Sequence, residues 1–286
     1  MKKGTRERPF LFLEMKMRIW YTVWQVIDMQ YVITVSVCLL AGMGAGLGTG
    51  FAGMSAAAVI TPMLVTFLGV EPYAAVGIAL ASDVLASAVS AYTYGKNKNL
   101  DIKNGIVMML AVLLFTVVGS YVSSLVPSTT MGNFSVFMTL LLGVKFIVRP
   151  VMTEKSDMAA QSARSRIIKS VVCGAVVGFI CGFVGAGGGM MMLLLLTSVM
   201  GYELKTAVGT SVFIMTFTAL TGAVSHFAIG GSPEVLLLVL CVAFTFLFAR
   251  IAAKIANKAS PAALNRMTGV ILVVLGAAVL VFSLIK

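Results

Sequence analysis

The chain has 286 residues, of which 59% are hydrophobic and only 11% charged, whereas soluble domains carry about 25% charged residues. Stretches without Asp, Glu, Lys or Arg cover residues 31–70, 104–144, 170–202 and 267–285, which excludes a soluble fold and predicts membrane-spanning helices of about 20 residues each. The net charge of +11 does not indicate nucleic-acid binding, because the basic residues lie in short connectors between apolar runs, where they orient the chain and contact anionic membrane lipid.

The chain opens with an N-terminal tail, residues 1–30, in which charges are mixed with aromatic rings. Glu14 and Arg18 interrupt the first apolar stretch too early for the core of a signal peptide. Trp20 and Trp24 lie among these charges, a mixture typical of a helix that lies in the membrane interface. We therefore expect an interfacial helix in this tail.

Apolar segments then follow in two sets of five. The first set lies near 31–50, 51–68, 73–94, 105–125 and 132–149, and the second near 167–184, 187–200, 205–229, 235–257 and 262–285. The pattern predicts an all-α, polytopic membrane protein. We expect a first transmembrane repeat at 31–149, a basic cytoplasmic linker at 150–169 and a second transmembrane repeat at 170–286.

The two sets align without gaps when the second is shifted back by 132 residues. Chance alignment of apolar segments would favour Leu and Val matches, but most of the matches here are glycine, with one glutamate. Internal repeats of this kind are common in secondary transporters. The matched pairs include Gly42 with Gly174, Gly46 with Gly178, Gly50 with Gly182, Gly53 with Gly185, Gly69 with Gly201, Glu71 with Glu203 and Gly77 with Gly209.

The charges of the connectors predict how the two repeats are related. Residues 95–104 contain three lysines, whereas their counterpart at 228–234 contains no basic residue. Conversely, residues 126–132 are uncharged, while their counterpart carries Lys254 and Lys258. The positive, cytoplasmic side therefore swaps between the halves, as an odd number of segments requires, and we expect inverted repeats. Residue 31 would then lie outside, so either residues 10–30 add a crossing or the basic tail is an exception to the bias.

Glycine-rich segments carry the strongest local pattern. Six of the twelve residues at 42–53 are glycine, and the second repeat carries Gly187-Gly188-Gly189. Spacing by four residues favours close helix packing, but it does not explain three adjacent glycines, which point in different directions. The alternative is a helix break inside each repeat, where a restarting helix points free N–H groups at a buried cavity. Two such breaks would face one another across one anion site.

The glycine segments at 42–53 and 174–189, each followed by an apolar run and then Gly-x-Glu…Ala-Val-Gly, resemble the TauE/SafE sulfite-exporter-like family. This family is also called the toluene-sulfonate uptake permease superfamily, and the resemblance covers roughly residues 31–285. In the first repeat Met54-Ser55-Ala56 replaces the glycine triplet. The resemblance implies transport of sulfite, a sulfonate or another organosulfur anion, in a direction that it does not fix.

An anion in the hydrocarbon needs donors to replace its water, and no Lys or Arg lies in the central part of the glycine-containing spans. Backbone N–H groups at the broken helices, assisted by hydroxyls, are the donors that remain. We therefore expect a substrate site formed by Gly46, Gly48, Thr49, Gly50, Ser55, Gly185, Gly187, Gly188, Gly189, Thr210 and Ser211.

Asp83 is a carboxylate in the middle of a span, and its counterpart in the second repeat is Met215. Such a residue indicates ion coupling, although a hydrogen bond between helices would also explain it. An alternative function is a transporter of a carboxylate or a cation that uses Asp83 as a ligand. No enzyme motif accompanies His226, and the four cysteines predict neither a metal site nor a cofactor. We expect a multi-pass transporter in a bacterial inner or plasma membrane, and its association into a homo-oligomer stays open.

Overall fold

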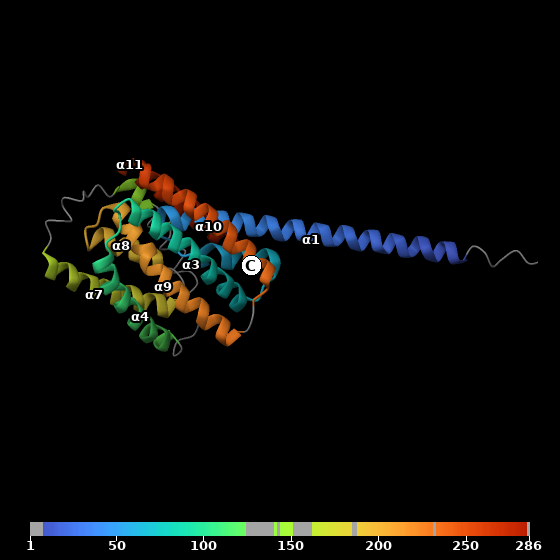
Figure 1. Ribbon diagram of the computed structural model, residues 1–286, viewed down its shortest axis with the longest axis horizontal. Helices are drawn as coiled ribbons and strands as arrows, with labels where there is room; N and C mark the ends of the chain where they lie inside the picture. Colours follow the sequence, from blue (N-terminus) through green and yellow to red (C-terminus); the bar gives the residue numbers. More distant parts are fainter. Residues whose placement is uncertain are drawn as a thin grey trace, which may run out of the picture.

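The computed structural model describes residues 8–123, 140–141, 144–150, 162–184, 188–230 and 233–284. The regular elements of this part are helices, which confirms the all-α class (Figure 1). Among the described residues, five helical stretches are long and apolar enough to cross a membrane: Met29–Ala52, Pro72–Lys96, Leu204–Ala228, Val235–Lys258 and Pro261–Ala278. The chain is therefore a polytopic membrane protein.

Helices of the two halves occupy corresponding positions. The first half contains α1 (Arg8–Ala52), α2 (Ala57–Leu68), α3 (Pro72–Lys96) and α4 (Ile102–Ser123). The second half contains α7 (Ala163–Val184), α8 (Gly188–Ser198), α9 (Leu204–Gly230), α10 (Val235–Lys258) and α11 (Pro261–Leu284). A shift of 132 residues places α8, α9 and α10 on α2, α3 and α4 to within a few residues, and it places α7 on the last 22 residues of α1.

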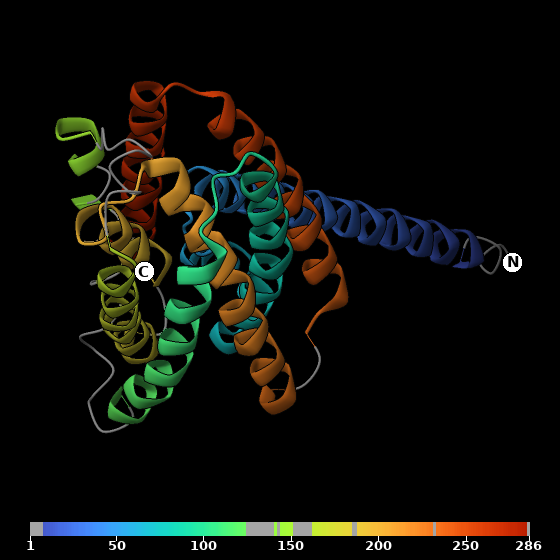
Figure 2. The same ribbon diagram turned by 60° about the vertical axis from the view of Figure 1, so that its left-hand side comes forward.

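The first span continues directly from the N-terminal segment. Helix α1 has 45 residues, which corresponds to about 68 Å at 1.5 Å per residue, more than twice the hydrocarbon thickness of about 30 Å. Figures 1 and 2 show it extending far beyond the other helices. Residues 10–41 contain neither Gly nor Pro, so nothing interrupts the helix at residue 30. The expected boundary between tail and first repeat is thus not a helix end.

The same local geometry ends α2 and α8. Gly69 and Gly201, which are counterparts in the repeat, have φ angles of 64° and 66° in the left-handed region that favours glycine. The N–H of Val70 donates to the Leu64 carbonyl over 3.2 Å, and the N–H of Tyr202 donates to the Leu196 carbonyl over 2.9 Å. Both helices therefore end in the same type of turn, which depends on glycine.

Glycines let α1 lie closely along α10, and α7 along α4. A Cβ added at Gly46 would stand 2.6 Å from the Thr245 carbonyl oxygen, and one at its neighbour in the pattern, Gly50, 2.5 Å from the Ala252 Cβ. In the second half, a Cβ at Gly174 would stand 2.6 Å from the Met108 carbonyl oxygen. Close packing, one of the two interpretations of these glycines, therefore accounts for the part of the pattern that lies inside α1 and α7.

Helices α3 and α9 cross the bundle in opposite directions. Near the start of α3, Tyr73 stacks on His226 from the end of α9, with ring centroids 4.4 Å apart. At the other end, a Cβ added at Gly209 near the start of α9 would stand 2.8 Å from the Tyr94 Cβ near the end of α3. Figure 2 shows the two helices side by side. The central pair is therefore antiparallel.

Hydrogen bonds join the two halves at the end of the bundle where α3 ends and α9 begins. The Tyr202 hydroxyl donates to Asp101 over 2.7 Å, and burial raises the pKa of Tyr202, so the hydroxyl keeps its proton. Asn99 donates to Asn257 over 2.7 Å, and Lys205 donates to the Asn257 carbonyl over 3.1 Å. We call this end the basic end, because the described helix ends and loops here carry Lys96, Lys98, Lys103, Lys205, Arg250, Lys254, Lys258 and Arg266.

Candidate functional site

The first helix break lies at residues 53–56, beyond most of the glycines that predicted it. Helix α1 runs through Gly42–Gly50 without interruption and ends at Ala52, because Gly53 turns the chain with a φ angle of +61°. The Thr49 hydroxyl donates to the carbonyls of Ala45 over 2.9 Å and Met54 over 2.8 Å, which holds the turn. Helix α2 then begins at Ala57, so the break is a short, buried reversal.

Two side chains from distant helices satisfy carbonyl groups at the end of α1. The Tyr94 hydroxyl donates to the Gly50 carbonyl over 2.9 Å, and the Thr268 hydroxyl donates to the Phe51 carbonyl over 3.1 Å. The last carbonyls of a helix have no partner within the helix, and in a buried site they need donors from elsewhere. Tyr94 and Thr268 therefore position the break, and no motif in the sequence identified either residue.

Asp83 lies against this break, at the N-terminus of α2. Its side chain is 1% exposed and accepts a hydrogen bond of 3.1 Å from the Ser87 hydroxyl. The Ser55 side chain and the Ala56 backbone, at the start of α2, also lie beside its carboxyl group. The N-terminus of a helix carries partial positive charge and unpaired N–H groups, which stabilise an anion. The acidic group at this restarting helix is thus a side chain of the protein itself.

The start of α8 meets the first break across the two halves. Gly189 lies directly against the Gly53 carbonyl oxygen, and a Cβ at Gly189 would stand 2.7 Å from the Met215 sulfur. The Ser211 hydroxyl donates to the same Gly53 carbonyl over 3.4 Å. Met215 holds the position in α9 that corresponds to Asp83 in α3. Among the described residues, therefore, the start of α2 has a carboxylate beside it at this repeat position, whereas the start of α8 has the Met215 thioether.

The structure separates the other expected substrate residues. Gly46 and Gly50 contact α10, and Gly48 contacts the Met54 side chain, so none of the three lies at an open cavity. Thr210 turns toward the α3–α4 loop, where its hydroxyl accepts a 3.2 Å hydrogen bond from the Asp101 N–H. Neighbouring helix residues point about 100° apart, which explains why Thr210 turns away while Ser211 faces the break.

The remaining expected residues are only partly described. Gly188 is the first residue of α8, whereas Gly185 and Gly187 lie outside the described residues. No group of three or more His, Cys, Asp or Glu side chains that could hold a metal ion occurs in the described part of the chain. The residues that the described structure brings together are Ser55, Asp83, Gly189 and Ser211.

Comparison with known proteins agrees with this architecture. The chain is 29% identical over 218 residues to "Probable membrane transporter protein YunE" of Bacillus subtilis, an alignment that covers 71% of this chain and 80% of the relative. It is 24% identical over 268 residues to "Probable membrane transporter protein MJ0441" of Methanocaldococcus jannaschii, covering 87% of this chain and 97% of the relative. No solved structure matches the chain significantly. The family model described as "Sulfite exporter TauE/SafE" matches residues 38–279, and the chain therefore belongs to this family of membrane transporters.

Proposed function

We propose that this protein is a secondary transporter that carries a small sulfur-containing anion, sulfite or an organic sulfonate, past the contact between its two halves. The observation that carries the proposal is the meeting of the break at Gly53 with the start of α8 at Gly189, beside the buried carboxylate of Asp83. Backbone that leaves the helical pattern at membrane depth is tolerated where it is buried in protein or lines a cavity. Membership of the family supports a transported sulfur anion.

The arrangement suggests how an ion gradient is coupled to the anion. The carboxylate of Asp83 and a substrate anion compete for the same donors, the start of α2 and the hydroxyl of Ser55. When Asp83 takes up a proton, it loses its negative charge and holds these donors less strongly. An anion entering from the side of Ser211 and Gly189 then finds donors without a competing charge. Proton and anion would thus move together, and loss of the proton would expel the anion.

The fold supports an inverted relation between the repeats. Helices α3 and α9 are counterparts and run antiparallel, and α1–α10 and α7–α4 are counterpart pairs that both pack through glycines. A two-fold axis that exchanges two antiparallel transmembrane helices lies in the membrane plane, as it does in transporters with inverted repeats. With the basic end in the cytoplasm, residue 31 lies outside and α1 carries the N-terminal segment away from that face.

This topology predicts opposite accessibility for the two ends of the bundle. Lys98→Cys and Glu234→Cys, each in a background without the four native cysteines, place one thiol at each end. In intact cells, a membrane-impermeant maleimide should label position 234 and leave position 98 unlabelled until the membrane is permeabilised. Glu71→Cys, at the start of α3, is the matched control and should behave like position 234. Labelling of 98 and 234 from one side would contradict the inverted arrangement.

Transport in proteoliposomes tests the proposed substrate class. We expect uptake of radiolabelled sulfite, taurine or sulfoacetate that rises when a proton gradient is imposed and disappears when it is dissipated. Malonate is the matched control for sulfoacetate, because a second carboxylate replaces the sulfonate. Gradient-driven uptake of malonate or of a cation, with none of the sulfur anions, would instead favour the alternative in which Asp83 binds the substrate directly.

A further inference from the structure

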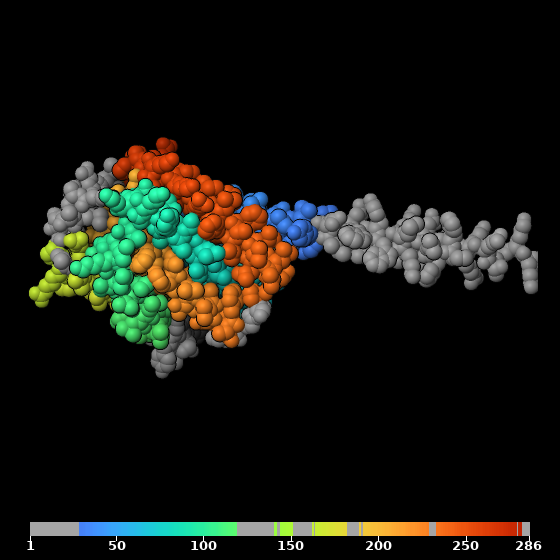
Figure 3. Space-filling view, viewed as in Figure 1, coloured from blue at the N-terminus to red at the C-terminus, as the bar shows by residue number. Residues whose placement is uncertain are grey.

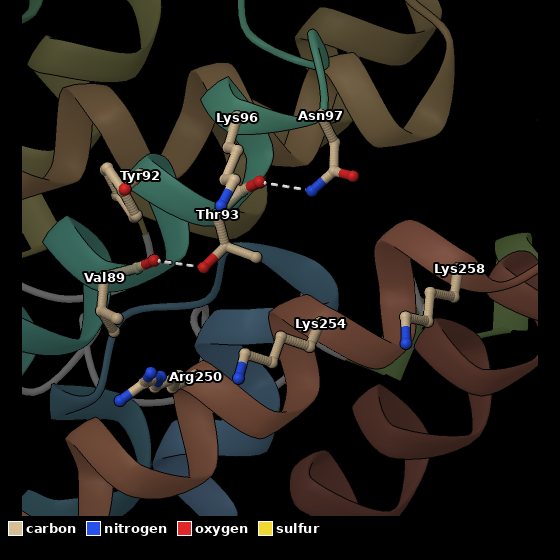
Figure 4. Close-up of a pocket in the computed structure, with 8 residues that line it drawn as sticks. All are labelled: Val89, Tyr92, Thr93, Lys96, Asn97, Arg250, Lys254 and Lys258. Carbon is tan, nitrogen blue, oxygen red and sulfur yellow. Dashed lines mark hydrogen bonds between the residues drawn. The ribbon is translucent and has the colours of Figure 1, made fainter.

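A second polar feature lies away from the helix breaks, where α3 and α10 end side by side. A pocket of about 660 Å³ opens between these two helices, which pack against one another. Figure 3 shows the surfaces of α3 and α10 next to one another, and Figure 4 shows the side chains around the opening. The lining residues are Val89, Tyr92, Thr93, Lys96, Asn97, Arg250, Lys254 and Lys258.

The pocket concentrates positive charge without an acidic partner. Its lining contains Lys96 from α3 and three cations from α10, and it contains no Asp or Glu. Arg250, Lys254 and Lys258 are spaced by four residues, so they project from one face of α10 (Figure 4). Like charges at this spacing destabilise a helix unless an anion lies between them. The arrangement is therefore suited to an anionic ligand.

The surface next to the pocket is apolar and exposed. On α3, Leu85 lies seven residues before Tyr92 and thus on the same helix face; the exposed fractions of these side chains are 47% and 71%. On α10, Leu247 lies seven residues before Lys254 and is 50% exposed. Leu85 and Leu247 thus lie about two helix turns farther from this end of the bundle than Tyr92 and Lys254. Tyr92 also has the amphipathic ring that is enriched where the membrane meets water.

We propose that this pocket binds an anionic phospholipid of the cytoplasmic leaflet, with the phosphate among the four cations and the acyl chains along Leu85 and Leu247. A free anion would use the charge but not the two exposed leucines. Basic pockets between transmembrane helices on the cytoplasmic side are suited to anionic lipid headgroups. The site is separate from the transport site, because Asp83 lies on the buried face of α3, about two and a half turns before Tyr92.

Lipid titration of the purified full-length protein tests the proposal. We expect dioctanoyl phosphatidylglycerol to raise the melting temperature in neutral detergent in a saturable way, and dioctanoyl phosphatidylcholine to have no effect. Replacing Arg250, Lys254 and Lys258 together by Gln should weaken the apparent affinity for phosphatidylglycerol about a hundredfold, since each cation near an anionic lipid contributes about fivefold. Native mass spectrometry should show that this triple variant retains one phosphatidylglycerol molecule fewer than the original protein.

A second variant that loses the same number of positive charges outside the pocket distinguishes a specific lipid site from general attraction between a basic protein and an anionic lipid. Lys103, Arg164 and Arg266 are exposed and lie outside the pocket lining, and their joint replacement by Gln should leave the affinity for phosphatidylglycerol within about twofold of the original. If the pocket triple variant does not fold, Lys254→Gln alone provides the comparison, with an expected loss of about fivefold. Equal losses in both triple variants, or equal stabilisation by inorganic phosphate or sulfite, would overturn the lipid site.

Discussion

Asp83→Asn should leave a folded protein that has lost gradient-driven transport. Asparagine keeps the size of the side chain and one acceptor for the Ser87 hydroxyl, but it cannot be ionised. We expect the gradient-driven rate in proteoliposomes to fall at least about tenfold, which requires only about 1.4 kcal/mol of lost coupling. Stability should fall by about 1 kcal/mol, because a hydrogen bond to a buried carboxylate is replaced by a weaker one. The dependence of the transport rate on pH, which we expect in the original protein, should be absent from the variant.

The sign of that pH dependence follows from the competition at α2. Protonation of Asp83 frees the donors at Ser55 and Ala56 for the substrate, so uptake should increase as the pH on the side of entry falls. Asp101→Asn is the matched control, because Asp101 is a carboxylate that accepts from Tyr202 and Asn104 at the basic end. It should retain the pH dependence of transport. A normal rate and normal pH dependence in Asp83→Asn would show that Asp83 has a structural role alone.

Gly46→Ala should prevent stable folding, whereas Gly44→Ala should be tolerated. The new methyl group at position 46 would stand 2.6 Å from the Thr245 carbonyl oxygen and 2.8 Å from the Ala249 nitrogen. Both atoms belong to the backbone of α10, which cannot move without separating the two helices. Overpacking of this kind costs about 1–3 kcal/mol where neighbours adjust, and it costs more where only backbone is available to move.

At position 44, the nearest atoms to an added Cβ are side-chain ends, Leu275 Cδ2 and Val59 Cγ1, both at 3.2 Å. These can shift by a few tenths of an ångström, and alanine gains about 1 kcal/mol of helix propensity over glycine. Melting temperature and the monodisperse fraction in detergent measure both variants. We expect a large loss for Gly46→Ala and a change within about 1 kcal/mol for Gly44→Ala. Similar behaviour of the two would show that α1 does not depend on close approach to α10.

The lipid pocket and the transport site predict separable phenotypes. Gln substitutions of Arg250, Lys254 and Lys258 should change the response to phosphatidylglycerol, whereas Asp83→Asn should change transport without altering that response. This separation is expected because the cations lie at the exposed end of α10 and Asp83 is buried within α3. The two groups of variants therefore act as controls for one another.

Ser55, Gly189 and Ser211, which the sequence predicted beside the substrate, lie around the Gly53 break, and their contact with a substrate stays a prediction. The position of Asp83 beside the start of α2 could not be predicted, because Ser55 is 28 residues away and sequence patterns report neighbours only along one helix. For the same reason, the sequence did not distinguish the glycines that pack against α10 from Gly53, which turns the chain.

The sequence by itself determined the membrane class and the positions of most of the described helices, and it predicted the internal repeat. These properties are local: apolar length specifies a span, and glycine specifies a left-handed turn wherever the backbone requires it, as at Gly69 and Gly201. Only the tertiary structure decided that Asp83 lies at the start of α2, and that Lys96 joins the cations of α10 around one pocket. Each of these depends on which helix faces meet, and that is set by packing between segments far apart in the chain.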